Sequence, residues 1–438
     1  MILKYDLIVC GGGPAGLMAA KTAAENNLEV ILFDVKKEIP RINRLCAMML
    51  HMDPGLHGIN VSVEPGKFVF HTNNFSVNYN GDIYDLYYKY FFSRSGYKFC
   101  IVNKNPCMGK VFDKEELLRG LLKEIEKLGV NVRTETMGIK AENTSDGVKV
   151  LVRSKGQVSS MEADMAIVAD GCNSRLTESL GLNETREHLG RAGPFMAYEM
   201  EGVECPYENS YIFYRGTTYA PTIVVNTIPR ASGNKEWIVL PRTEEGMKYF
   251  LTKGKVAYWF KRAKIIQKGS YQNELYSPIM VPVAGNFIIV GDAAGTYEVL
   301  IHTALACGYK AGIAVGKAVK GEKEGLKEYV DWWQNSIEYV KKPRDPSYYR
   351  RDARGMGFEK YYTEEEIDYL FSLIDNEMFP GVMNPFKGFN TMVDAFLKCQ
   401  DVIQKEKPAL LKKIERWIDM SPEEFKATRS AFSYKVIK

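Results

Sequence analysis

The residues with the clearest chemical potential form a glycine-rich turn near the start of the chain. Residues 5–10 are a short apolar run typical of a buried parallel strand, and the next six are Gly-Gly-Gly-Pro-Ala-Gly. Gly11 permits a tight turn, Gly13 lets the backbone approach a pyrophosphate, and Gly16 lets a helix pack closely on the strand. That helix offers backbone N–H groups and a partial positive charge to phosphates. The turn therefore predicts a dinucleotide-binding site.

An acidic residue stands at the distance that such a site requires. An Ala-rich helical stretch, residues 17–26, connects the turn to a second apolar run, residues 29–33, which ends at Asp34. The Asp34 carboxylate is placed to accept hydrogen bonds from a ribose 2′-OH. Its negative charge would repel a 2′-phosphate, so the bound nucleotide is expected to lack one.

Two later motifs each place an aspartate beside a glycine after an apolar run. Residues 165–168 precede Asp170-Gly171, and residues 287–290 precede Gly291-Asp292-Ala293-Ala294-Gly295. Ligands of open α/β sheets bind outside the carboxyl ends of the strands, so these corners are expected to contact the dinucleotide. An NAD dehydrogenase needs neither motif.

In this order and spacing the three motifs resemble those of the p-hydroxybenzoate-hydroxylase-type FAD flavoproteins, and the geranylgeranyl reductase family is the nearest match among them. The similarity covers about residues 1–320 and includes residues 111–119, which in such proteins open a helix that ends near Gly129. The resemblance implies FAD, with Asp292 at its ribityl and pyrophosphate part. Asp170 and Gly171 resemble a second fingerprint that is often linked to NAD(P)H use. With the glycine turn, the predicted cofactor-binding residues are Gly11, Gly13, Pro14, Ala15, Gly16, Asp34, Arg41, Arg44, Arg119, Asp170, Gly171, Gly291, Asp292, Ala293 and Gly295.

The roles of Arg41, Arg44 and His302 each allow two interpretations. Arg41 and Arg44 lie where the chain of this family passes the flavin, but an equally good interpretation makes them ordinary solvated cations. Typical members follow the third motif with a Pro and a Gly-rich loop, which are missing here before residues 301–308. His302 is therefore a candidate to stand at the flavin pyrimidine edge, where it would stabilise anionic reduced flavin. A capping or buried histidine is the commoner alternative.

Cys46 falls where reductases of this family commonly carry a cysteine close to the flavin ring. A thiol there could donate a proton to an alkene that is being reduced, or act as a redox partner. Met48, Met49 and Met52 follow it and would suit an oily substrate, although core packing is the default for such a stretch. Cys46 and His302 are thus the two candidate catalytic residues.

Composition limits the class of protein. The 438 residues are 45% hydrophobic and 26% charged with a net charge of +4, which excludes disorder and gives no argument for a nucleic-acid partner. The eight cysteines form no CxxC pair or metal-like spacing, so reduced thiols and no metal are expected. No apolar run reaches the roughly 18 residues of a spanning helix, and we expect a cytoplasmic protein, with peripheral membrane contact as a further option.

The predicted fold class is α/β, with three units. A doubly wound, Rossmann-like βαβ domain that binds FAD spans residues 1–190 and 282–320. An inserted antiparallel β-sheet domain for the substrate spans 191–281, because alternating apolar residues recur there. A helical region spans 321–438, with helical runs near 326–340, 364–374, 391–403 and 408–418.

The predicted function is that of an FAD-dependent oxidoreductase that transfers hydride between reduced flavin and a hydrophobic substrate. The most specific form of this prediction is the saturation of an isoprenoid C=C bond, and it rests on the resemblance. A flavin monooxygenase acting on an aromatic or apolar substrate is the alternative, and a non-catalytic FAD-binding or lipid-carrying protein is a third. The sequence has no second GxGxxG unit, so NAD(P)H visiting transiently or a protein electron donor is the expected reductant. The oligomeric state stays open.

Overall fold

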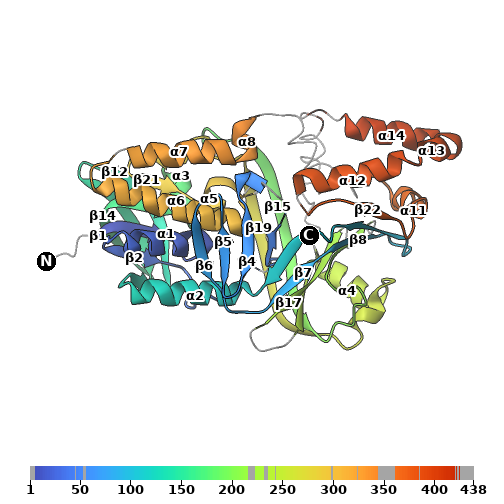
Figure 1. The fold of residues 1–438 in the computed structure, drawn as a ribbon, viewed down its shortest axis with the longest axis horizontal. Coiled ribbons are helices and arrows are strands. Elements are labelled where there is room, and N and C mark those ends of the chain that lie inside the picture. Colours follow the sequence, from blue (N-terminus) through green and yellow to red (C-terminus); the bar gives the residue numbers. More distant parts are fainter. Residues whose placement is uncertain are drawn as a thin grey trace.

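The first of two large β-sheets is built around the amino-terminal strands, at the blue end of the chain in Figure 1. The computed structural model describes residues 5–44, 46–52, 56–215, 222–230, 235–241, 243–296, 299–322, 324–343, 361–383, 385–419, 421 and 424. Parallel strands run in the order β11-β2-β1-β14, with β21 beside β14, and β13 and β12 continue the sheet in antiparallel fashion. The strands are β1 (Tyr5–Cys10), β2 (Val30–Phe33), β11 (Asn131–Arg133), β12 (Thr136–Thr144), β13 (Gly147–Ser154), β14 (Gln157–Val168), β20 (Val283–Ala284) and β21 (Phe287–Ile289).

The apolar runs of β1 and β2 explain why these strands lie inside the sheet. All four residues of β2 and the last four of β1 are buried, as expected for parallel strands that are covered on both faces. Helices α1 (Pro14–Glu25) and α6 (Ile301–Val319) pack closely on each other, and α7 (Glu324–Ser336) lies along α6. The side chain of Tyr329 on α7 donates to the carbonyl oxygen of Ile289 at 3.0 Å, which fixes α7 to β21. The predicted α/β, Rossmann-like fold class is confirmed.

The second large sheet is mostly antiparallel and includes strands from three distant parts of the chain. Its order is β19-β15-β18-β17-β16-β8-β9-β22. The strands are β8 (Tyr88–Phe92), β9 (Lys98–Val102), β15 (His188–Glu201), β16 (Ser210–Arg215), β17 (Thr222–Pro229), β18 (Lys235–Val239), β19 (Lys264–Tyr276) and β22 (Met378–Pro380). We therefore propose that the substrate unit includes residues 88–102 besides residues 191–281.

Successive side chains of β16 point to opposite faces of this sheet. Ile212 and Tyr214 belong to a separate apolar cluster around Trp259, whereas Tyr211 and Phe213 pack toward the main core. One face of the sheet is thus available to a site that it shares with the first sheet.

Smaller elements connect the two sheets and extend the chain. Two three-stranded sheets have the orders β3-β10-β7 and β4-β5-β6. Their strands are β3 (Met49–His51), β4 (Val61–Glu64), β5 (Lys67–Phe70), β6 (Phe75–Asn78), β7 (Ile83–Leu86) and β10 (Gly109–Phe112). The short helical segments of the chain are η1 (Leu56–Gly58), η2 (Ala257–Phe260), α3 (Arg175–Ser179), α4 (Glu244–Thr252), α5 (Asp292–Gly295) and α8 (Glu338–Lys341). A longer helix, α2, spans Lys114–Lys127.

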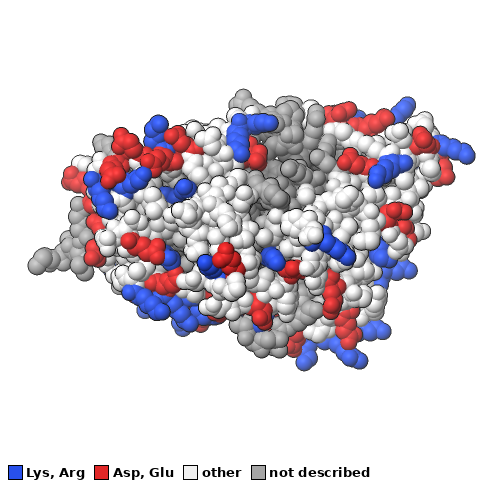
Figure 2. All heavy atoms as spheres, viewed as in Figure 1, with Lys and Arg blue, Asp and Glu red and all other residues white. Residues whose placement is uncertain are grey.

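The carboxyl-terminal helices lie at the β22 edge of the second sheet (Figure 1). They are α11 (Glu364–Ser372), α12 (Pro385–Leu397), α13 (Gln400–Glu406) and α14 (Pro408–Ile418). Phe99 of β9 makes edge-to-face contacts with Phe371, Phe379 and Phe396, so this region shares the main core. None of the described helices is long and apolar enough to cross a membrane. On the face drawn in Figure 2, acidic and basic side chains are interspersed.

One buried arginine ties several of these layers together. The Arg230 guanidinium contacts Asp113 at 2.8 Å and Glu236 at 2.7 Å, and it also pairs with Glu199. Asp113 in turn caps the amino end of α2, where its Oδ1 accepts from the backbone N–H of Glu115. Arg230 therefore joins the end of β17 to β15, β18 and α2.

Candidate functional site

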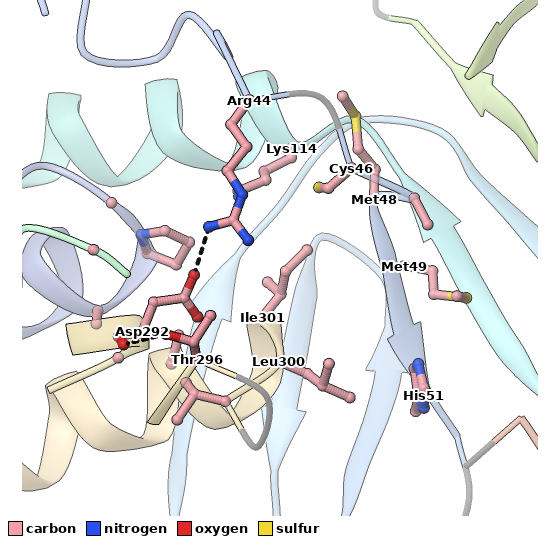
Figure 3. A pocket seen from close by; sticks show the side chains of 18 of the residues that line it. Arg44, Cys46, Met48, Met49, His51, Lys114, Asp292, Thr296, Leu300 and Ile301 are labelled. Atoms are coloured by element: carbon pink, nitrogen blue, oxygen red, sulfur yellow. Dashed lines mark hydrogen bonds and ion pairs between the residues drawn. The ribbon is translucent and has the colours of Figure 1, made fainter. Parts of the chain in front are cut away.

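The three motifs meet at the carboxyl ends of three adjacent parallel strands. The glycine turn follows β1, Asp170-Gly171 follows β14, and Gly291-Asp292 follows β21. A cavity of about 530 Å³ opens there and reaches the second sheet (Figure 3). Its lining residues are Gly13, Pro14, Ala15, Arg44, Cys46, Ala47, Met48, Met49, His51, Lys89, Lys114, Ala169, Gly171, Tyr211, Phe213, Tyr271, Gly291, Asp292, Thr296, Val299, Leu300, Ile301, Ala304 and Met383.

Steric contacts explain the glycines of the turn. Gly11 has φ +116°, and a Cβ there would lie 2.3 Å from the carbonyl oxygen of Ala169. A Cβ on Gly16 would lie 1.8 Å from the carbonyl oxygen of Gly11, so no larger residue fits between helix and strand. A Cβ on Gly13, by contrast, would meet nothing within 4 Å, because this residue faces the cavity. The turn leaves room for a ligand at the amino end of α1.

A smaller cavity of about 230 Å³ lies on the other side of the turn. Gly11, Asp34, Asp170, Asn173 and Arg175 are among its lining residues. The turn thus separates two cavities, each of which could take one end of a dinucleotide. An extended FAD fits this arrangement, with its nucleoside at Asp34 and its flavin in the larger cavity.

Backbone N–H groups hold the Asp34 carboxylate in place beside the smaller cavity. Its Oδ2 accepts from the N–H of Gly12 at 2.6 Å and its Oδ1 from the N–H of Lys36 at 2.7 Å, and the residue is only 8% exposed. Each carboxylate oxygen keeps further acceptor capacity for a ribose hydroxyl.

Asp34→Ala is therefore expected to weaken FAD binding by about 10- to 100-fold, the usual effect of losing hydrogen bonds to a charged group. Fluorescence titration of the apoprotein with FAD would measure this. Asp6→Ala is a matched control, because Asp6 also accepts from a backbone N–H, that of Glu29 at 2.8 Å, in the same unit. Unchanged FAD retention in Asp34→Ala would remove Asp34 from the site.

Charged side chains gather where a pyrophosphate would lie. Arg44 contacts Asp292 at 2.8 Å and its guanidinium lies 5.2 Å from the centre of the Tyr271 ring, while Lys114 lines the same cavity (Figure 3). Burial in the cleft raises the pKa of the Asp292 carboxyl, and Arg44 and Lys114 oppose that shift. Two cations against one carboxylate leave a positive balance that suits phosphate oxygens.

The opposite part of the cavity is mostly apolar. Met48, Met49, Leu300 and Ile301 line it together with the half-buried Cys46. Met48 has φ +47°, an unusual backbone conformation for a non-glycine residue, directly after the segment that carries Cys46.

Two tyrosines of the second sheet lie beside Cys46. Burial raises the pKa of Tyr211, and Tyr271 and Cys46 are close enough to raise it further. Tyr211 therefore stays protonated at neutral pH. The cavity thus brings an S–H and an O–H group to its apolar part.

Not every predicted site residue lines this cavity. Arg41 and Arg119 lie in a third cleft of about 540 Å³, where Arg41 contacts Glu115 at 3.4 Å and Arg119 pairs with Glu116. His302 is buried, 1% exposed, behind the wall formed by its neighbours Ile301 and Ala304. Gly16, Ala293 and Gly295 support the turn and α5 from within the core. Two residues of the altered loop, Tyr297 and Glu298, lie outside the described residues.

Several lining residues were missed by the sequence analysis. Lys114 stands inside the stretch 111–119 that carried the resemblance, so its position was available as a signal. Lys89, Tyr211 and Tyr271 come from strands whose pairing no local pattern discloses. His51 lies within the methionine-rich segment, between Met49 and Met52, but carried no spacing typical of a site.

Comparison with known proteins finds relatives among flavin-dependent enzymes. Residues 6–39 match a family model described as an FAD binding domain. The chain is 28% identical over 348 residues to a digeranylgeranylglycerophospholipid reductase from Methanocaldococcus jannaschii, covering 77% of this chain and 84% of the relative. A crystal structure of a geranylgeranyl bacteriochlorophyll reductase-like protein from Thermoplasma acidophilum superposes with a TM-score of 0.63 at 17% identity, covering 95% and 99% of the two chains.

The fold is also that of other flavin enzymes. The flavin-dependent monooxygenase PieE, solved with FAD and substrate, superposes with a TM-score of 0.59 at 15% identity, covering 98% of this chain and 72% of that one. Sequence similarity extends over most of the chain to the reductase, whereas the monooxygenase shares the fold. The chain is thus a flavoprotein of the FAD-dependent oxidoreductase fold, and its resemblance to the geranylgeranyl reductase family is confirmed.

Proposed function

We propose that this protein is an FAD-dependent oxidoreductase that saturates a C=C bond in a hydrophobic, isoprenoid-type substrate. The observation that carries the proposal is the continuity of one cavity, from the residues suited to hold FAD to an apolar part that contains Cys46. The named activity of the M. jannaschii relative, reduction of a digeranylgeranylglycerophospholipid, supports the same class of substrate. Bound FAD supplies the hydride chemistry.

The residues of this chain position the partners and supply the proton. Arg44, Lys114 and the amino end of α1 would hold the cofactor phosphates, with Asp292 orienting Arg44. Met48, Leu300 and the neighbouring apolar side chains exclude water from the reacting carbons. Saturating an alkene takes one hydride and one proton, and the Cys46 Sγ–H or the Tyr211 Oη–H would donate that proton.

Each turnover oxidises the flavin, so a reductant must reduce it again. We propose NAD(P)H visiting the cavity transiently, or a protein electron donor, because the sequence has a single glycine-turn nucleotide motif. Stopped-flow mixing of the holoprotein with NADH or NADPH would separate the two. Bleaching of the flavin band by either nucleotide supports the first option, and the absence of bleaching leaves the protein donor.

Hydroxylation is the second candidate reaction, because PieE shares the fold. Product analysis separates the two activities. Reduced holoprotein supplied with a geranylgeranyl lipid without oxygen is expected to yield a product that has gained two hydrogens. A product that gains one oxygen, formed only in air, would favour the monooxygenase, and no product under either condition would favour a carrier protein.

We further propose that the protein is cytoplasmic and meets its lipid substrate at a membrane surface. Ile265 and Tyr258 are 50% and 53% exposed, which suits contact with the apolar part of a lipid surface, while the nearby cations Arg262 and Lys264 pair with Glu204 and Glu201. Co-sedimentation with anionic vesicles tests this, and equal recovery with and without vesicles would argue against it.

A further inference from the structure

One residue of the carboxyl-terminal region reaches the larger cavity. Among the described residues that line this cavity, Met383 alone comes from the part of the chain after α8. It follows the end of β22 by three residues and is only 3% exposed. The reaction proposed above gives Met383 no task, although its side chain forms part of the cavity wall.

The backbone just before Met383 is held against the second sheet. β22 pairs with β9 in parallel, and the N–H of Gly381 donates to the carbonyl oxygen of Val102 at 3.2 Å. A Cβ on Gly381 would lie 2.4 Å from Cγ2 of Ile101 and 3.2 Å from the hydroxyl oxygen of Thr391 on α12. Gly381 is therefore enclosed between β9 and α12, and this close packing fixes the segment that carries Met383.

The register of the second sheet shows where this segment lies. Tyr211 of β16 is paired with Lys89 of β8, and Lys89 is paired with Ile101 of β9. Directly paired residues of neighbouring strands share one face of a sheet, so the three side chains form a row on the cavity side. Neighbouring strands lie about 4.8 Å apart, so the row extends about 10 Å from Tyr211 to Ile101, on which Gly381 packs.

The other end of this row leads to the residues suited to hold the cofactor phosphates. Burial raises the pKa of Tyr211, and Tyr271 is close enough to add to that shift. The Arg44 guanidinium in turn lies 5.2 Å from the centre of the Tyr271 ring and pairs with Asp292. Met383 thus lies at the end of the cavity that is remote from Arg44.

The lining between these two ends is largely apolar. Figure 3 shows Met49 across the cavity from Arg44 and Asp292, with Cys46 nearer to Arg44. An apolar pocket selects a chain by volume: each carbon that fits gains free energy, whereas a carbon that does not fit must displace a buried side chain. A thioether offers such a chain an apolar and adaptable surface without a polar group.

We propose that Met383 is the end wall for the apolar chain of the substrate and sets the chain length that the site accepts. The chain would run from the cofactor past Cys46 and Met49 to Met383. The inference rests on the proposed function for the nature of the chain. The position of the wall rests on the strand register and the cavity lining.

Equilibrium binding to the FAD-loaded protein tests the end wall without turnover. The probes are geraniol, farnesol and geranylgeraniol, which share one end group and differ in the number of isoprene units. In calorimetry, Met383→Ala is expected to raise the ratio of geranylgeraniol to geraniol affinity by about 10- to 100-fold over the wild-type protein, the usual effect of a small volume change in an apolar pocket. Met383→Phe should lower the same ratio, because the larger ring shortens the space.

Met392→Ala is the matched control. Met392 lies on α12 in the same region and is 0% exposed, but it does not line the cavity. The substitution removes the same atoms from the core and should leave the affinity ratio unchanged, even where it lowers stability. Met383→Val removes less volume and replaces Met383→Ala if that variant fails to retain FAD.

Three results would overturn the inference. They are an unchanged affinity ratio in the Met383 variants, an equal change of the ratio in Met392→Ala, and a uniform loss of affinity for all three alcohols in the Met383 variants. The proposed function fails separately. If the Met383 variants change the chain preference but the protein reduces no isoprenoid, the end wall stands and the reductase proposal falls.

Discussion

Arg230→Met is expected to destabilise the protein by about 3–5 kcal/mol, as measured by the urea midpoint of the FAD-loaded protein. The substitution removes the only cation that contacts Asp113, Glu199 and Glu236 in the ion pairs of the described residues. Glu199 is 1% exposed and Asp113 4%, so their carboxylates would remain buried close to one another without compensation.

Arg262→Met is the matched control for Arg230→Met. Arg262 pairs with Glu204 at 3.1 Å, but the two side chains are 81% and 50% exposed. Such a pair contributes about 0–1 kcal/mol, so the unfolding midpoint should hardly move. An effect of Arg230→Met as small as that of Arg262→Met would show that the cluster does not hold the layers together.

Cys46→Ser is expected to lower the turnover of an isoprenoid substrate by about 10²- to 10⁴-fold, the range of general acid catalysis. Serine has nearly the same size, but its hydroxyl is a far weaker acid than a thiol, so proton donation to the alkene carbon would fail. Cys46 lines the apolar part of the larger cavity, whereas Asp34 lines the smaller cavity on the other side of the glycine turn. FAD content should therefore stay unchanged.

Two further variants make the result specific. Tyr211→Phe removes the phenol hydroxyl, the second candidate donor, and Cys399→Ser changes a half-buried thiol in the turn between α12 and α13. Cys399→Ser should turn over normally. If Tyr211→Phe slows turnover and Cys46→Ser does not, the phenol is the donor. Normal turnover in both Tyr211→Phe and Cys46→Ser would mean that the proton comes from solvent. Cys46 would then contribute only to packing.

The sequence predicted the part of the site that local geometry determines. The glycine turn and Asp34 lie within 30 residues, and their spacing alone places them at the ends of β1 and β2. The apolar periodicity likewise located α14, which spans Pro408–Ile418. Such features need only neighbouring residues, so no long-range pairing has to be known.

The rest of the site depends on contacts between distant segments. Arg44 and Asp292 are 248 residues apart, and nothing near either residue indicates their ion pair. Lys89 faces the cavity because β8 pairs in parallel with β16, and β22 joins the same sheet from the carboxyl-terminal region. The position of His302 follows from helix geometry, because the turn that brings Ile301 and Ala304 to the cavity directs residue 302 into the core.

We expect one extended FAD to span the two cavities on either side of the glycine turn. The most direct test of this expectation is the flavin content of the purified, folded protein, read from visible absorption before and after incubation with FAD. We predict a yellow protein that reaches one FAD per chain. A folded sample that is colourless and stays colourless with excess FAD would contradict the account.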